Sequence, residues 1–349
     1  MRRVGELWER LVSFENLHAA FLGASRGKRR RPDVLAFAPD VERRLFEIRD
    51  ALEAGAYGFG PYRTFHVADT KRRLIMAAPF RDRVVHHAIV NVLDPVFDPT
   101  LIADTYACRR GKGNHAAMRR LRDLVRGDPR AYALKCDVSR YFASVDHAAL
   151  LGLLERKVKD RRVLDLCASL VAATPVDPAF GPGRGIPIGN LTSQMFANLY
   201  LSPLDGHAKQ VLGLGRYLRY VDDIVALDGD KRRLHAALAS MEAFAAERLR
   251  LAFHPRKSII APVRCGVDFV GFVVSPARVR VRRAALVRFR RRERGLRRAC
   301  WRGELAPERY WRSVESFAAH AAHADAHRLL ATMGLQSFRP QGREGGRAE

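Results

Sequence analysis

Hydrophobic positions recur every three or four residues over the first 55 residues, and this spacing predicts helices there. The positions that share it are Leu7, Leu11, Phe14, Leu17, Val41, Leu45, Ile48 and Leu52. Glycines and a proline at 55–61 end the second helical pattern. The segments 62–67 and 74–77 then predict a hairpin of two short strands with a turn at Asp69 and Thr70.

Three apolar, β-prone segments farther along predict the strands that carry the chemistry. They are 131–138, 218–227 and 266–274, and we expect them to form one floor. Helices are predicted over 82–93, ending at Pro95, over 114–126, and in the arginine-rich segment after Pro276. This order of elements indicates an α+β fold rather than a wound parallel sheet.

The charge of the chain is more informative about its partner than its hydrophobic content is. Lysine and arginine number 62 against 37 acidic residues, which gives a formal net charge of +25. Such a potential attracts polyanions, so nucleic acid is favoured as a partner over an anionic membrane or a mere compositional arginine bias. Basic residues concentrate at 26–31 and 278–302, and we expect two basic walls flanking a groove.

Cysteine usage and hydropathy bear on the compartment. The five cysteines include no CxxC pair, so the sequence indicates neither a disulfide framework nor a zinc module and fits a reducing cytoplasm. The uncharged stretch 185–204 contains several amide and hydroxyl side chains and makes a poor membrane span. We therefore expect a cytoplasmic protein with no membrane partner and no signal peptide.

Aspartates stand out at the ends of two predicted strands. Asp222 and Asp223 lie in Tyr-Val-Asp-Asp between apolar segments, where adjacent carboxylates are costly unless a cation neutralises them. A solvated Asp-rich turn is the alternative interpretation of this tetrapeptide alone. Asp137 ends the hydrophobic segment 131–138 and supplies a third carboxylate. Three such ligands from separate strands favour two-metal phosphoryl transfer.

These aspartate segments resemble motifs of a known family. Residues 137–142 are similar to the first palm motif of reverse transcriptases and 220–223 to their YxDD motif, and the similarity covers roughly 60–275. The resemblance implies a right-hand polymerase of the α+β class, with an antiparallel palm sheet packed on helices. It also implies RNA-directed DNA synthesis with two Mg²⁺ ions, or Mn²⁺ in their place, on Asp137, Asp222 and Asp223.

The resemblance divides the chain into the lobes of a hand. It implies an N-terminal helical extension at 1–60, fingers at 61–130 and 147–184, a palm at 131–146 and 185–275, a basic helical thumb at 276–338, and a disordered tail at 339–349. The thumb is expected to contact the duplex backbone without reading sequence.

The family pattern also assigns a nucleotide pocket and a primer grip. The pocket residues are Lys71, Arg72, Arg73, Phe142, Ile188, Gly189 and Gln194, with Arg73 aligned better than Arg72 to the triphosphate contact. Phe142 is expected to exclude a 2′-hydroxyl, with a plain core residue as the alternative. The primer grip is Phe269, Gly271 and Phe272. Arg109, Arg110 and Lys112 are weaker candidates for template or triphosphate contacts.

Two further predictions concern proton transfer and a histidine row. Lys257 lies in a segment that resembles the motif near the leaving pyrophosphate and is the candidate general acid, with His254 second. His320, His323 and His327 follow helical spacing, which favours a packing or surface face over a metal site.

The Ile-Gly-x-x-x-Ser-Gln form at 188–194 departs from most reverse transcriptases, which carry Gln at the position of Ile188 and Ser-Pro at that of Ser193 and Gln194. It resembles the enzymes of diversity-generating retroelements, which misread template adenines during mutagenic retrohoming. Losing an amide donor leaves discrimination to shape, which rejects similar mispairs weakly.

That subtype implies several partners and an origin. The partners are a template RNA, the cDNA/RNA duplex, deoxynucleoside triphosphates and a small basic accessory protein, in a prokaryotic or phage-encoded system. The alternatives are another prokaryotic reverse transcriptase, of group II-like, retron or abortive-infection type, and a non-catalytic basic RNA-binding protein with a vestigial site.

Overall fold

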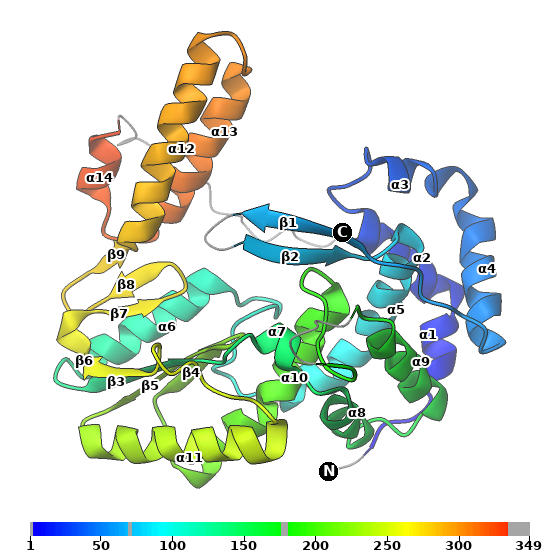
Figure 1. The fold of residues 1–349 in the computed structure, drawn as a ribbon, viewed down its shortest axis with the longest axis horizontal. Helices are drawn as coiled ribbons and strands as arrows, with labels where there is room; N and C mark the ends of the chain where they lie inside the picture. The colour runs from blue at the N-terminus through cyan, green and yellow to red at the C-terminus, as the bar shows by residue number, and fades with distance from the viewer. Residues whose placement is uncertain (1–2, 69–71, 176–180, 334–349) are drawn as a thin grey trace.

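The computed structural model describes residues 3–68, 72–175 and 181–333, and it is mixed helix and sheet (Figure 1). Most of the helices before residue 207 form one module, in which α2 and α5 pack along each other. Ser13 caps α2 by accepting a hydrogen bond from the amide of Asn16 at 3.2 Å. The module comprises α1 (Trp8–Val12), α2 (Phe14–Ser25), α3 (Pro32–Leu35), α4 (Val41–Glu53), α5 (Phe80–Phe97), α8 (His147–Glu155), α9 (Arg161–Ala172) and α10 (Leu191–Gly206).

A four-stranded antiparallel sheet forms the floor of the second module. Its order is β4-β5-β3-β6. The strands are β3 (Tyr132–Asp137), β4 (Tyr217–Tyr220), β5 (Asp223–Asp228) and β6 (Ile259–Pro262). Both faces of this sheet are covered. Alternate side chains of a strand point to opposite faces, so a strand can contribute to two cores. Leu134 and Cys136 pack in the core that includes α11 (Lys231–Leu249), whereas Ala133 packs in the core that includes α6 (Asn114–Gly127).

Two smaller sheets are separate from this floor. The hairpin β1 (Arg63–Ala68) and β2 (Arg72–Ala77) extends from the helical module toward the C-terminal helices (Figure 1). A three-stranded sheet of β7 (Val267–Phe269), β8 (Phe272–Val274) and β9 (Val279–Val281) packs on α6. The hairpin prediction at 62–77 is therefore confirmed, while its turn at 69–70 lies outside the described residues.

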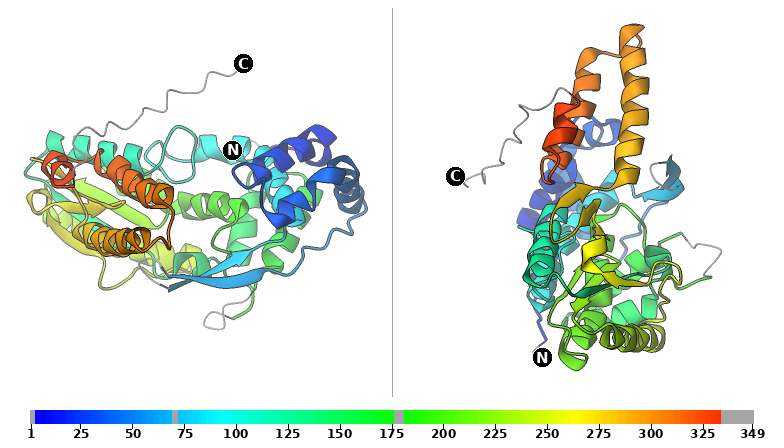
Figure 2. Two further views of the ribbon diagram at one scale, coloured as in Figure 1. Left: turned by 90° about the horizontal axis from the view of Figure 1, so that it is seen from above. Right: turned by 90° about the vertical axis from the view of Figure 1, so that its left-hand side faces the viewer.

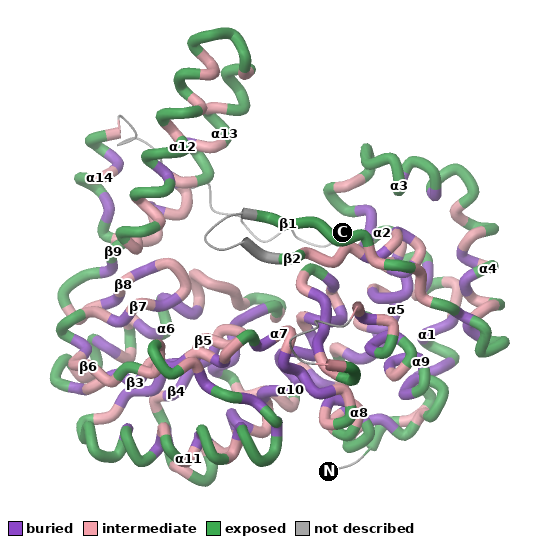
Figure 3. Tube along the Cα trace, viewed as in Figure 1, coloured by how far each residue is buried: buried purple, intermediate pink, exposed green. Residues whose placement is uncertain are grey.

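The C-terminal helices stand away from the rest of the molecule (Figures 1 and 2). They are α12 (Arg283–Trp301), α13 (Pro307–Ala321) and α14 (His327–Ala331). Phe289 and Phe317 stack at 3.9 Å between ring centroids and join α12 to α13. Most of α12 is exposed (Figure 3). A helix so rich in arginine has little apolar surface to bury, which explains why Phe289 is its buried residue.

The base of these helices contacts the rest of the protein through histidines. His320 stacks on Phe272 at 4.4 Å between ring centroids, and His323 stacks on His115 of α6 at 3.6 Å. Burial, followed by the neighbouring histidines, lowers the pKa of His115 to about 4. The interpretation of His320 and His323 as a packing face is confirmed.

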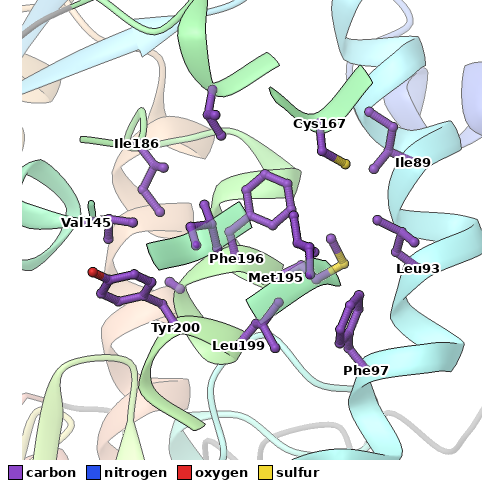
Figure 4. Close-up of a cluster of buried hydrophobic side chains, with 14 of the residues drawn as sticks. Ile89, Leu93, Phe97, Val145, Cys167, Ile186, Met195, Phe196, Leu199 and Tyr200 are labelled. Carbon is purple, nitrogen blue, oxygen red and sulfur yellow. The ribbon is translucent and has the colours of Figure 1, made fainter. Parts of the chain in front are cut away.

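The main core surrounds α10 (Figure 4). Phe196 and Tyr200 of α10 are fully buried, and Ile186 of the preceding loop lies beside them. Leu93 and Phe97 of α5 close the other side. Burial of one such side chain stabilises the fold by about 2 kcal/mol, so α10 and its preceding loop are held firmly.

Two expectations about the elements were wrong, and one strand was not predicted. Pro95 does not end the helix at 82–93, because α5 continues to Phe97. A proline removes one backbone donor, and so near the C-terminus only the last turn loses a bond. The segment 266–274 is two strands of a separate sheet rather than part of the floor. The place beside β3 is taken by β6, a short strand ending in Pro262 that was not predicted.

No helix in the described ranges is long and apolar enough to cross a membrane. The expected tail at 339–349 and the end of the expected thumb, 334–338, lie outside those ranges.

Candidate active site

The turn between β4 and β5 carries two of the candidate aspartates. Tyr220 pairs with Asp223 across the hairpin, which leaves Val221 and Asp222 as its two loop residues. Val221 has a φ of +55°, a conformation that β-branched residues rarely adopt. A two-residue hairpin turn requires a positive φ at its first central residue, so the short connection imposes this conformation.

The third candidate aspartate lies directly beside this turn. Asp137 is the last residue of β3 and is the register partner of Asp223 on β5. Directly opposed residues in an antiparallel pair have their Cβ atoms about 5 Å apart and on one face. The pairing of two strands that are distant in sequence therefore brings Asp137 and Asp223 together, with Asp222 next to them in the chain.

Two lysines provide counter-charges for these carboxylates. The ammonium group of Lys257 contacts Asp137 Oδ2. Lys135 Nζ lies 3.5 Å from Asp223 Oδ1, which is buried and has no hydrogen-bond partner among the described residues. Burial raises the pKa of Asp223 to about 6, and the charge of Lys135 opposes the rise. Among the residues that the structure describes, no group of three or more His, Cys, Asp or Glu side chains is arranged to hold a metal ion.

The segment that contains Lys257 is fixed against the end of β3. The amide of His254 donates to the Asp137 carbonyl at 2.7 Å, and the amide of Lys257 donates to the His254 carbonyl at 3.0 Å. His254 Nδ1 accepts a hydrogen bond from the amide of Arg256 at 3.3 Å. This geometry brings Lys257 to the aspartates and gives His254 a local structural contact.

The loop at 185–190 forms a wall of the same region. Its backbone is tied to the segment after β3, because the amide of Ile186 donates to the carbonyl of Phe142 at 2.8 Å. Phe142 lies in α7 (Tyr141–Ser144) and is half-buried, as is Ile188. Gly189 has a φ of +115°, and a Cβ there would lie 3.7 Å from the Ile75 side chain of β2. The loop and the β1–β2 hairpin therefore meet at Gly189.

Of the other predicted pocket residues, only Gln194 is described with its side chain. Gln194 lies half-buried in the first turn of α10. Arg72 and Arg73 begin strand β2, but their side chains, like the whole of Lys71, are outside what the structure describes.

The predicted primer-grip residues form the β7–β8 hairpin. Phe269 and Phe272 are register partners and are fully buried, so their rings belong to the core between this sheet and α6. The turn at Val270 and Gly271 is half-exposed, and Gly271 has a φ of +94°. Lys135 Nζ donates to the Asp268 carbonyl at 2.5 Å, which ties the hairpin to the palm-like floor.

The prediction that Arg109 contacts template or triphosphate was wrong. Its guanidinium is largely buried and bonds to Asp98, at 2.5 Å from Nε, and to the carbonyls of Ile102 and Thr105. Its donors are therefore used inside the protein. Lys112 likewise contacts the carbonyl of Ala103.

Sequence reasoning gave no role to three residues that border the turn, namely Lys135, Asp205 and Arg219. Lys135 could have been found from the strand period, because it is two residues before Asp137 and so lies on its face. Arg219 and Asp205 are both fully buried and ion-paired. Charged residues are almost never fully buried unless paired, and the pairing of residues distant in sequence gives no local signal.

Residues 66–274 match the model of the family described as reverse transcriptase (RNA-dependent DNA polymerase). The match covers more than half of the chain, and the chain belongs to this family. With the antiparallel sheet packed on helices, it confirms the predicted right-hand polymerase fold of the α+β class. The predicted enzyme class, an RNA-directed DNA polymerase, is confirmed at the level of the family.

Relatives at low identity include proteins of group II introns. The chain is 24% identical over 263 residues to protein YkfC of Escherichia coli, covering 64% of this chain and 69% of YkfC. It is 23% identical over 207 residues to the group II intron-encoded protein LtrA of Lactococcus lactis, covering 57% of this chain but 33% of LtrA. A solved telomerase from Candida tropicalis matches with a TM-score of 0.48 and 13% identity, over 64% of this chain and 49% of that one.

Proposed function

We propose that this chain extends a DNA primer along an RNA template, with Asp137, Asp222 and Asp223 as its catalytic carboxylates. The observation that carries the proposal is the register pairing of Asp137 with Asp223 beside the turn that holds Asp222. Together with membership of the family, this arrangement favours a working site over a vestigial one.

The carboxylates fit a divalent cation, with Mg²⁺ as the expected ion and Mn²⁺ as the alternative. Carboxylate oxygens are the hard ligands that Mg²⁺ takes, and Asp223 Oδ1 is buried with no hydrogen-bond partner among the described residues. Asp137, Asp222 and Asp223 would hold the ions. A pair of bound ions supplies charge neutralisation at the attacking and leaving oxygens.

Lys257 is proposed as the proton donor. Its ammonium group contacts Asp137 Oδ2, which places the amine beside the candidate carboxylates. A protonated amine in this place can neutralise the leaving pyrophosphate by giving up its proton.

The lobes follow the arrangement of the elements. We assign α1 to α4 to the N-terminal extension, and the β1–β2 hairpin with α5, α8 and α9 to the fingers. The four-stranded floor with α10 and α11 belongs to the palm, and α12 to α14 form a basic thumb. The deoxynucleotide would lie between Phe142 and the loop at Ile188 and Gly189, close to β2. The Val270–Gly271 turn would face the primer, and template RNA would follow the basic surface.

The finer proposal is that synthesis is error-prone at template adenines, as in a diversity-generating retroelement. Ile188 is half-buried in the loop that faces the β1–β2 hairpin and presents an apolar side chain there. A pocket that lacks an amide donor discriminates by shape, which separates similar base pairs poorly. A small basic accessory protein belongs to the same proposal.

Primer extension on an adenine-containing RNA template tests both levels. Wild type should make cDNA with Mg²⁺, and Asp222→Asn should make none. Asp228→Asn is the matched control, because Asp228 lies at the other end of β5 and pairs with Arg233. Sequencing should show errors at adenines that Ile188→Gln reduces. Accurate cDNA would leave polymerisation and refute the mutagenic subtype, whereas RNA binding without cDNA would refute the polymerase.

A further inference from the structure

An ion pair lies fully buried directly behind the Val221–Asp222 turn. Arg219 of β4 and Asp205 of α10 both have no exposed side-chain surface. Arg219 Nε donates to Asp205 Oδ1 at 2.7 Å and Nη2 donates to Oδ2 at 2.6 Å, which is the bidentate arrangement. No step of the proposed chemistry uses either residue.

Every donor of the Arg219 guanidinium has an acceptor. A guanidinium carries five N–H groups, of which Asp205 accepts two. The remaining three, two on Nη1 and one on Nη2, donate to α10 and to the turn. Nη2 donates to the carbonyl of Asn198 at 3.2 Å, and Nη1 donates to the Asn198 side-chain oxygen at 3.4 Å and to the carbonyl of Val221 at 2.9 Å.

The partners of Arg219 are themselves held from several directions. Tyr217 donates to Asp205 Oδ1 at 2.8 Å and Thr105 donates to Oδ2 at 3.3 Å. Burial and the Asp205 carboxylate raise the pKa of Tyr217 well above its usual value, so its hydroxyl remains a donor. The Asn198 amide group donates to the carbonyl of Ala107 at 2.7 Å. The network is therefore fully connected and stiff.

The contact with Val221 is the one that points to function. Val221 is a β-branched residue with a φ of +55°, a strained conformation that persists only where the surrounding structure imposes it. The Arg219 bond holds the carbonyl on the C-terminal side of this residue, and the same peptide group contains the amide of Asp222. Fixing that peptide plane restricts the backbone from which the Asp222 side chain projects.

We infer that Arg219, braced by Asp205, is a positioning residue that locks the Val221–Asp222 peptide and couples the catalytic turn to helix α10. This inference rests on the proposed function of Asp222. Helix α10 begins next to the pocket loop and carries Gln194. Through Arg219, a shift of α10 would be transmitted to the Val221–Asp222 turn.

Stability alone does not account for the pair. Replacing a buried ion pair by apolar side chains of similar volume is often neutral or stabilising, whereas removing one partner alone is strongly destabilising. An apolar pair could fill the same volume. It could not donate a hydrogen bond to the carbonyl of Val221.

This difference gives the test. The double variant Arg219→Met/Asp205→Leu keeps the volume and removes both charges. Because Tyr217 and Thr105 lose their acceptor, thermal unfolding should show it folded with a Tm below that of wild type. We expect its single-turnover extension rate to fall about tenfold or more, with the KM for deoxynucleotide within about threefold. Hydrogen exchange of the peptide 217–224 should be faster.

The matched control is Arg216→Met/Asp128→Leu, because this ion pair, at 2.6 Å, lies at the other end of β4 and is partly exposed. It should leave the rate and the exchange of 217–224 unchanged. A folded Arg219/Asp205 double variant with wild-type rate and wild-type exchange would overturn the inference. If wild type itself makes no cDNA, the proposed function fails, while faster exchange in the double variant still supports the locking of the turn and unchanged exchange overturns it.

Discussion

The stability of the helical module should depend on pH through His86. This side chain of α5 is 1% exposed, and neither ring nitrogen has a hydrogen-bond partner among the described residues. Burial, followed by the charges of His87 and Arg83, lowers its pKa to about 3, whereas an unfolded histidine titrates near 6.5. Between these values the unfolded state binds the proton and the folded state does not.

The sign and size follow from this difference. Stability is complete above the unfolded pKa and is lost as the pH falls below about 6.5, because protonation then favours the unfolded chain. For a pKa of about 3 against one of 6.5, the loss between pH 7 and pH 5 is about 2 kcal/mol. His86→Leu removes this dependence and also removes two buried nitrogens without partners.

Chemical unfolding at pH 7, 6 and 5 measures the effect. The difference in free energy of unfolding between wild type and His86→Leu should shift by about 2 kcal/mol over this range, in favour of the variant at low pH. His235→Leu is the control, because His235 lies exposed on α11 and should not change the pH slope. Parallel curves for wild type and His86→Leu would refute the reasoning.

Two further substitutions have directions fixed by the structure. Gly189→Ala forces a Cβ at φ +115° beside Ile75, so we expect the KM for deoxynucleotide to rise in steady-state extension, and a wild-type KM would contradict the role of the loop. Arg109→Met leaves Asp98 and two carbonyls without their donor, so we expect about 2–3 kcal/mol lower stability in denaturant unfolding with an unchanged KM, and a raised KM at unchanged stability would restore the contact role.

Local patterns in the sequence were sufficient to predict the strands that carry the aspartates. They did not predict which strands lie beside them in the sheet. The segment ending at Asp137 and the Tyr-Val-Asp-Asp turn are the ends of β3 and β5, as expected. The alternation of a strand reveals which face is apolar, but it carries no information on which strand lies next to it. Hence 266–274 was assigned to the floor, where β6 lies instead.

Buried charge was the other feature that sequence could not reveal. An arginine in a sequence is normally interpreted as exposed, which is why Arg109 was expected to meet a ligand. In both Arg109 and Arg219 the guanidinium is directed inward to a carboxylate that is brought close by tertiary folding. The position of Asp205 relative to Arg219 depends on how α10 is placed in the core, which is set by tertiary packing.

Two lysines lie beside the candidate catalytic aspartates and offset part of their charge. Lys135 offsets part of the charge of Asp223, and Lys257 offsets part of the charge of Asp137. The chain as a whole carries a net charge of +25. Its surface therefore attracts nucleic acid, while the carboxylates offer oxygen ligands to a cation at the place where the phosphates must be neutralised. Both lysines come from segments outside the turn, so the balance depends on the packing of β3 and of the segment 254–257.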